Sequence, residues 1–148
     1  MSNRGELSRD FTRWVRDECL CLHVQRAART LARRFDDALR PLGLTQGQFS
    51  LLMSLNRAEP PSVGDVATLL AMDRTTVTAA VKPLRRRGLI KVMMDKQDKR
   101  GRRLILTAAG HALLTAAGPL WRHAHAQCER LLTGSSADSL RSSLRELC

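Results

Sequence analysis

The segment from Asp73 to Leu106 constrains the fold most strongly. Asp73 is a typical N-cap residue, a helical pattern follows it, and Gly88 is a typical residue to end a helix. Two short extended runs come next, LIKVMM and RRLIL, and the polar loop DKQDKRG separates them. Extended runs on either side of a charged loop that contains glycine predict a β-hairpin. The segment therefore predicts a helix that is followed directly by a hairpin.

A shorter helix is predicted immediately before this segment. Ser62 and Asp65 have the spacing of a helix start, and the helical pattern continues through Val66, Leu69 and Leu70. Leu70–Ala71–Met72 then forms a tight turn between the two helices. Two short helices joined by a tight turn, with a basic hairpin after the second, form a winged helix-turn-helix.

A long helix is predicted on the N-terminal side of this unit. From Arg16 to Leu39, apolar residues recur at steps of three and four. This spacing predicts one helix of about six turns with a single buried stripe. Pro41 and Gly43 end the helix.

Three further helices complete the predicted order. Thr45 and Gln48 have capping-box spacing at the start of a short helix, whose inward residues are predicted to be Phe49, Leu52, Met53 and Leu55. Thr107 is the predicted N-cap of a helix from about Ala108 to Leu132, and a last helix runs from Ala137 to Leu147. The predicted fold is mainly α with a small β-hairpin wing. It is a winged helix-turn-helix with long N- and C-terminal helices, in one domain of residues 1–148.

Positive charge is concentrated in the predicted winged unit. The formal net charge is +11, and the residues from Asp73 to Arg103 contribute +8 of it through eleven Lys or Arg and three Asp. A field of this kind suits a polyanion, because each neutralised phosphate releases condensed counterions. A bare run of charge is more often a solvated surface. Here it coincides with a winged helix-turn-helix, which favours double-stranded DNA as the partner.

The second helix of the unit has two different faces. Val77, Ala80, Val81 and Leu84 form the apolar face, which predicts packing against the domain. The N-terminal part of the other face is expected to read base edges in the major groove, through Arg74, Thr75, Thr76 and Thr78. Basic residues further along are expected to meet phosphates: Lys82, Arg85, Arg86 and Arg87. In the hairpin loop, the basic residues Lys96, Lys99, Arg100 and Arg102 are expected to lie along the DNA backbone, with one Arg in a narrow minor groove.

At these positions the chain resembles the MarR family of transcriptional regulators. The segments that carry the resemblance are RTTVTAAVKPLRRRGLI and DKQDKRGRRLILTAAG. The second contains the family's wing signature, Asp98–Lys99–Arg100 followed by a hydrophobic residue, Leu-Thr and Gly110. The similarity extends to LRPLGLTQGQFSLLMSL and to the long first helix. Pro83, inside the recognition helix, departs from the family pattern and is expected to bend or tighten the last turn.

The resemblance implies a homodimer that binds a palindromic operator, as a repressor released by an oxidant or small ligand. Residues 1–44 and 108–148 would supply the dimerisation helices, and residues 45–107 the DNA-binding region. By the family pattern, Asp98 orients Arg100, and Arg100 enters the minor groove. The alternative for the same residues is a non-specific nucleoid-type DNA-binding protein.

The resemblance also suggests two kinds of effector. Cys21 falls where the branch of the family that senses organic hydroperoxides has its reactive cysteine, and Cys128 falls near a resolving cysteine. That branch uses tyrosines beside its thiolate, whereas this chain has no Tyr and carries Phe35 and Gln46 at those places. Cys19 is an alternative thiol, and a small buried hydrophobe is the alternative role for each cysteine. A ligand pocket is the second possibility, with the candidate lining residues His23, Phe35, Phe49, Met53 and His111, and Trp14 and Trp121 as weaker candidates.

Other classes of protein fit the sequence less well. It has no Gly-rich phosphate loop, no G-x-S-x-G and no HExxH, so an enzyme is not expected. There is no CxxC pair, and His125 with Cys128 is too small a set to bind a metal ion, so neither a metal nor a cofactor is expected. A protein-interaction module would leave the excess basic charge without a use. The absence of a signal peptide and of a membrane span predicts a cytoplasmic protein.

Overall fold

The computed structural model describes residues 7–148, and a Ser, Thr or Asp N-cap begins each of its α-helices except the one that follows Cys19. The capping boxes predicted at Thr45 and Ser62 are confirmed, and Asp73 and Thr107 cap their helices through side-chain oxygens. The elements are α1 (Arg9–Glu18), α2 (Leu20–Leu39), the 3-10 turn η1 (Arg40–Leu42), α3 (Gln46–Ser54), α4 (Val63–Leu70), α5 (Arg74–Arg86), β1 (Ile90–Met94), β2 (Arg102–Leu106), α6 (Ala108–Glu129) and α7 (Ala137–Arg145). The mainly helical fold class with a two-stranded wing is therefore confirmed.

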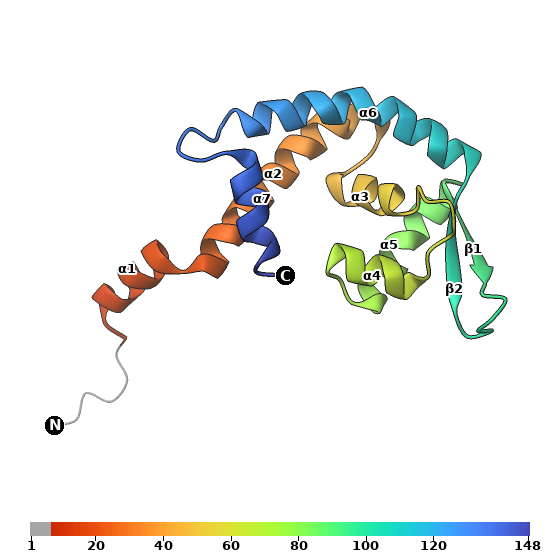
Figure 1. Ribbon diagram of the computed structural model, residues 1–148, viewed down its shortest axis with the longest axis horizontal. Coiled ribbons are helices and arrows are strands. Elements are labelled where there is room, and N and C mark those ends of the chain that lie inside the picture. Colours follow the sequence, from red (N-terminus) through yellow and green to blue (C-terminus); the bar gives the residue numbers. More distant parts are fainter. Residues whose placement is uncertain (1–6) are drawn as a thin grey trace.

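One hydrophobic core joins the winged unit to the long helices α2 and α6. Helices α3, α4 and α5 and the hairpin lie on one side of α6, while α2 packs along α6 (Figure 1). The largest fully buried side chains come from the long helix, the short helices and the hairpin: Leu39, Leu52, Val66, Val77, Leu84, Ile90 and Leu104. This core fixes the hairpin and the recognition helix α5 on one rigid body.

The hairpin is antiparallel and continues into a short contact with the start of α4. Ile90 pairs with Leu106, and Met94 pairs with Arg102 at the loop end. Ser62 forms an isolated bridge with Arg103, and the amide of Leu104 donates to the carbonyl of Pro61 at 2.9 Å. The wing is thus attached to the residues that begin the helix-turn-helix.

The predicted single helix from Arg16 to Leu39 is wrong at its N-terminal end. The chain is extended at Cys19, which separates α1 from α2, and α1 begins seven residues before Arg16, at Arg9. Cys19 Sγ accepts a hydrogen bond from the amide of Leu22 at 3.4 Å and so caps α2. Cysteine is not among the residues usually found at N-caps, so the sequence pattern gave no signal for this break.

The apolar stripe predicted on the long helix is not buried within one chain. Leu20 is 69% exposed and Leu31 is 39% exposed, and Leu39 is the buried residue of α2. On α3, Met53 is 45% exposed rather than inward, whereas Phe49, Leu51 and Leu52 are buried. Apolar residues therefore remain uncovered along the helices that extend away from the winged unit.

The turn of the helix-turn-helix is made by a residue in the left-handed conformation. Ala71 has φ 52° and ψ 46° and ends α4, in the tight turn that the sequence predicts. This backbone region costs a non-glycine residue about 1 kcal/mol. The amide of Met72 donates to the carbonyl of Ala67 at 2.9 Å, which holds the turn closed.

Across residues 7–148, no helix is both long and apolar enough to span a membrane.

Candidate nucleic-acid interface

Helix α5 presents an exposed face of threonine and basic residues. Val77, Val81 and Leu84 are buried, and the residues predicted to read bases are exposed: Arg74, Thr75, Thr76 and Thr78. The hydroxyl of Thr78 donates to the carbonyl of Arg74 at 2.9 Å. Its proton is used within the helix, so the hydroxyl oxygen is left as an acceptor for amino groups of adenine or cytosine.

The first turn of α5 is fixed by Asp73. Its carboxylate accepts a hydrogen bond from the amide of Thr76 at 2.7 Å. The backbone and side-chain hydrogen bonds of Thr76 hold the pKa of the Asp73 carboxyl below its ordinary value. The cap thereby orients the turn that carries the candidate base-reading residues.

Arg74 lies against the first turn of α4. A Cβ built on Gly64 would stand 3.0 Å from one terminal nitrogen of the Arg74 guanidinium. Glycine at this position leaves space for the guanidinium to lie over the α4 backbone. The two helices of the motif are therefore in contact beside the exposed face of α5.

Four basic residues near the end of α5 fall into two groups. Lys82, Arg85 and Arg86 are exposed, as expected of residues that meet phosphates. Arg87 instead donates through Nη1 to the carbonyl of Gly43 at 2.8 Å, and so joins the end of α5 to the end of η1. One nitrogen of the Arg87 guanidinium is thus used within the protein, and a contact of Arg87 with phosphate stays a prediction.

Pro83 does not interrupt α5, which continues to Arg86. The amide of Gly88 donates to the carbonyl of Arg85 at 2.9 Å, three residues back. The amide of Leu89 donates to the carbonyl of Leu84 at 3.0 Å, and Gly88 has φ 74°, so these two bonds form the glycine C-cap that the sequence predicts. Pro83 therefore lies within a helix that ends at Gly88, and its expected effect on the last turn stays a prediction.

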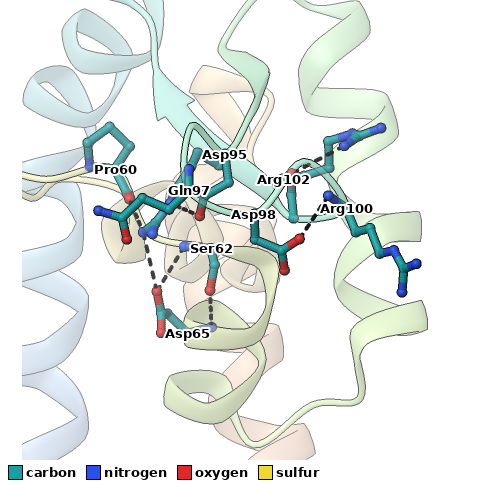
Figure 2. Close-up of polar contacts among 10 residues, drawn as sticks. Pro60, Ser62, Asp65, Asp95, Gln97, Asp98, Arg100 and Arg102 are labelled. Atoms are coloured by element: carbon teal, nitrogen blue, oxygen red, sulfur yellow. Dashed lines mark hydrogen bonds and ion pairs between the residues drawn. The ribbon is translucent and has the colours of Figure 1, made fainter.

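The wing loop is ordered by hydrogen bonds within itself. The amide of Gly101 donates to the carbonyl of Asp98 at 2.9 Å, and the Asp98 carboxylate accepts from the amide of Arg100 at 3.0 Å. Asp98 thus orients the backbone of Arg100 rather than its guanidinium. Figure 2 shows the Arg100 side chain pointing away from the labelled carboxylates, whereas Arg102 turns back towards the loop. Arg102 Nη1 donates to the carbonyls of Lys99 and Gly101, each at 3.2 Å.

Arg103 holds the base of the wing, a role that the sequence reasoning missed. Its Nε donates to Asp95 Oδ2 at 2.9 Å, and its Nη1 donates to the carbonyl of Pro60 at 3.0 Å. The same Nη1 lies 3.9 Å from Asp65 Oδ2. Strand alternation was the available signal: Arg103 pairs with Met93, and Asp95 is two residues after Met93, so Asp95 and Arg103 lie diagonally on the same face of the hairpin.

Two carboxylates around Arg103 are stabilised in the charged form. The backbone amide of Gln97 is the main cause that lowers the pKa of Asp95; burial opposes it, and the hydrogen bond from Arg103 makes a smaller contribution that also lowers this pKa. The hydrogen bonds of Ser62 lower the pKa of Asp65. Figure 2 shows Ser62 and Asp65 joined by these reciprocal bonds at the start of α4.

A cavity of 470 Å³ lies between α3 and α6. Three of the predicted pocket residues, Phe49, Met53 and His111, line it together with Asn56, Trp121 and Arg122. His23 and Phe35 are not among its lining residues. Phe35 stacks on Trp121 with a ring separation of 6.1 Å, and His23 bonds to the carbonyl of Asp17 at 2.9 Å.

The four cysteines are all free thiols. Cys21 is exposed on α2 and its Sγ accepts a hydrogen bond from Gln25 at 3.3 Å. Cys128 on α6 is half-buried, as is Cys19. Gln46, at one of the family's tyrosine positions, donates to Ser50 at 2.8 Å. Within residues 7–148, no three or more His, Cys, Asp or Glu residues gather in a way that could hold a metal ion.

Comparison with known proteins places this geometry in a family. The model of the family described as MarR family matches residues 44–101. The crystal structure of the Mycobacterium tuberculosis transcriptional regulator MosR in complex with DNA is 37% identical, covers 88% of this chain and 93% of that chain, and has a TM-score of 0.80. The transcriptional repressor CouR, bound to a 23-mer DNA duplex, is 28% identical over 97% of this chain and 99% of its own, with a TM-score of 0.79.

Curated relatives match over a smaller part of their length. The transcriptional activatory protein BadR of Rhodopseudomonas palustris is 31% identical over 62% of this chain and 54% of its own length. The chain spans between 50% and 61% of the first curated relatives that it matches. The family match covers the helix-turn-helix, β1 and the wing loop, and the similarity to MosR covers nearly the whole of both chains. The chain therefore belongs to the MarR family of transcriptional regulators.

Proposed function

We propose that this chain is a sequence-specific DNA-binding transcriptional regulator, and that it represses transcription from a palindromic operator. The observation that carries the proposal is the exposed Thr75–Thr78 face of α5 beside a wing loop from which Arg100 projects. The DNA complexes of MosR and CouR support it, since both proteins share the fold. BadR is named as an activatory protein, so the proposal of repression rests on the resemblance to repressors such as CouR.

The proposed contacts divide into three groups. Arg74, Thr75, Thr76 and Thr78 read base edges, Lys82 and Arg86 hold phosphates, and the wing contributes Lys99, Arg100 and Arg102. Asp98 orients the loop that carries Arg100 through the bond to the Arg100 amide. The proposal gives the chain no catalytic step and places it in the cytoplasm, with the DNA that it would bind.

The functional unit is proposed to be a homodimer. Apolar residues on the terminal helices are exposed in the single chain, including Phe11, Trp14 and Leu20 near the N-terminus and Leu140, Leu144 and Leu147 near the C-terminus. Residues 7–44 and 108–148 would cover each other across a twofold axis, which removes this apolar surface from water. Residues 1–6 of the predicted dimerisation segment 1–44 lie outside the described residues. Sedimentation equilibrium tests the dimer directly, and a monomer at micromolar concentration contradicts it.

Selection of duplexes from a randomised library tests the proposed DNA recognition. We expect the protein to enrich a palindromic sequence, and to bind it at least about 10³-fold more tightly than a scrambled duplex of equal composition. Affinities are measured over a series of salt concentrations, because phosphate contacts alone give steep salt dependence. Equal affinity for both duplexes favours the nucleoid-type alternative. Arg100→Ala is expected to reduce the affinity for the enriched duplex strongly, and normal binding contradicts the assignment of the wing.

Two effector sites are compatible with this function. The cavity lined by Phe49, Met53 and His111 lies between the winged unit and α6, and its walls are mostly apolar, which suits a small aromatic ligand. Cys21 is exposed, as a thiol that reacts with a hydroperoxide must be, and Cys128 is the proposed resolving thiol. The redox route is tested by the Cys21 experiment in the Discussion.

A further inference from the structure

We infer that Arg103 is a positioning residue: it fixes the wing against α4 so that Arg100 is presented to DNA, and it makes no base contact itself. The inference rests on the proposed function and adds the residue that holds the wing in place. Its basis is that the Arg103 guanidinium contacts three segments: the start of the wing loop, the turn before α4 and the first turn of α4.

Arg103 links parts of the chain that are distant in sequence. Its Nε donates to Asp95 at the start of the wing loop, and its Nη1 donates to the carbonyl of Pro60 in the turn before α4. Asp65, in the first turn of α4, lies 3.9 Å from the same Nη1. Both nitrogens are therefore engaged within the protein, which leaves this guanidinium less able to bind phosphate than the unattached guanidinium of Arg100.

The contact between Arg103 and Asp95 is sheltered from water. The side chain of Asp95 is 14% exposed, and that of Arg103 is 38% exposed, whereas the other ion pairs of the described residues are more open. Shelter weakens screening by salt, so this pair orients the chain more firmly than a surface ion pair does.

Asp95 transmits the position of Arg103 to the loop that carries Arg100. Its carboxylate also accepts from the amide of Gln97 at 2.9 Å, and its own amide donates to the carbonyl of Gly101 at 3.1 Å. The two ends of the loop are thus tied to one residue, which Arg103 ties to α4. Loss of either partner would leave the strands paired and the backbone bond from Leu104 to Pro61 in place, but would loosen the wing loop that extends beyond that bond.

The effect of Asp95→Asn on DNA affinity distinguishes a positioning role of Arg103 from direct contact with DNA. Asp95→Asn removes a negative charge from a surface near DNA, so electrostatics alone predicts tighter binding. If Asp95 works by holding Arg103 and the loop, the same substitution weakens binding. The sign of the effect separates the two roles.

The experiment uses the full chain and the duplex enriched by the wild-type protein. We expect Arg103→Gln and Asp95→Asn each to weaken binding by about tenfold, the size of the loss of one charge-assisted contact. The control is Lys91→Gln, which removes an equal charge from the face of the hairpin that carries Arg103 and should change affinity by less than about threefold. Tighter binding by Asp95→Asn overturns the inference.

A double-mutant cycle with Arg100→Ala distinguishes positioning from a general loss of structure. If Arg103 acts through the wing tip, Arg103→Gln should cost less than about threefold once Arg100 is absent, because the contact it positions is already gone. Equal effects in both backgrounds overturn the inference. Thermal unfolding of each variant is recorded in parallel. If Arg103→Gln does not fold, the DNA affinity of Asp95→Asn tests the inference alone. Failure to enrich any duplex would instead contradict the proposed function, so the two failures are distinguishable.

Discussion

Gly110, in the first turn of α6, packs directly against the carbonyl group of Leu89. A Cβ on Gly110 would overlap the Leu89 oxygen and would stand 2.8 Å from a methyl carbon of Leu106. The same junction is held by the hydroxyl of Thr107, which donates to the carbonyl of Gly88 at 2.6 Å. The long helix that leaves the winged unit is therefore seated on the start of the hairpin through backbone contact.

This contact predicts that Gly110→Ala lowers the free energy of unfolding by about 1–3 kcal/mol, because the helix must move away from backbone atoms that cannot yield. Gly47→Ala in α3 is the control, since a Cβ on Gly47 would meet no atom of a neighbouring segment within 4 Å. We expect the control to be neutral or stabilising by up to about 1 kcal/mol, as alanine favours helix. Chemical denaturation at one protein concentration measures both. Equal stability of the two variants contradicts the close packing.

Thr75→Val should change which sequences are bound more than how tightly the best one is bound. Valine keeps the shape of the side chain and a methyl group for thymine but loses the hydroxyl that can bond to a base edge. Repeating the library selection with the variant measures the preference at each position. An unchanged sequence logo would show that Thr75 reads no base.

Arg86 and Arg87 are adjacent but should differ in the salt dependence of DNA binding. Arg86→Gln removes a proposed phosphate contact from each subunit of the dimer, so the slope of log K against log salt should become shallower by about 1.8, which is about 0.9 per contact. Arg87 is bonded to the carbonyl of Gly43, so Arg87→Gln should leave the slope unchanged and lower thermal stability instead. If both variants change the slope equally, Arg87 also meets phosphate.

Acid should destabilise the fold partly through Asp73. Its pKa is lowered in the folded chain by the hydrogen bonds of Thr76, so its contribution is present above the unfolded pKa near 4 and is lost as the pH falls through the folded value. Asp73→Asn keeps a capping oxygen but does not titrate there. Melting temperatures below pH 4 should therefore fall less steeply for the variant than for the wild type. Parallel curves would show that the cap does not depend on charge.

The redox route predicts loss of DNA binding after stoichiometric organic hydroperoxide. Cys21 is exposed and can be oxidised to a sulfenic acid, which Cys128 would convert to a disulfide. Cys21→Ser should then retain binding after the same treatment, with Cys148→Ser as the control for an exposed thiol elsewhere. If the Cys21→Ser protein also loses binding, Cys21 is not the switch. If the wild type keeps binding, the cavity between α3 and α6 becomes the site to test.

The winged unit could be predicted from the sequence because its signals are local. Caps at Ser62 and Asp73, the glycine after α5 and the two extended strands each act within a few residues. The break at Cys19 could not be predicted, since a thiol replaces the usual capping oxygen. The exposure of Leu20 and Leu31 was also missed, because periodicity shows that a face is apolar but not whether its partner belongs to the same chain.

The candidate site was predicted by residue type, and its internal contacts were not. The spacing of Thr75, Thr78 and Lys82 placed them on one face without reference to the rest of the fold. In contrast, Arg87 and Arg103 stand among other basic residues and cannot be told from them by type. Their partners Gly43 and Pro60 are more than forty residues away along the chain. Basic residues that bind the protein can be told from those left free only when the fold is known.

The first turn of α4 supports both elements that are proposed to read DNA. Gly64 lies under the guanidinium of Arg74, and Asp65 lies beside that of Arg103. A genetic screen for variants that lose operator control should therefore recover substitutions in this turn as readily as in α5 or the wing. Such alleles would be misjudged as folding defects by anyone who looked only for residues that touch the nucleic acid.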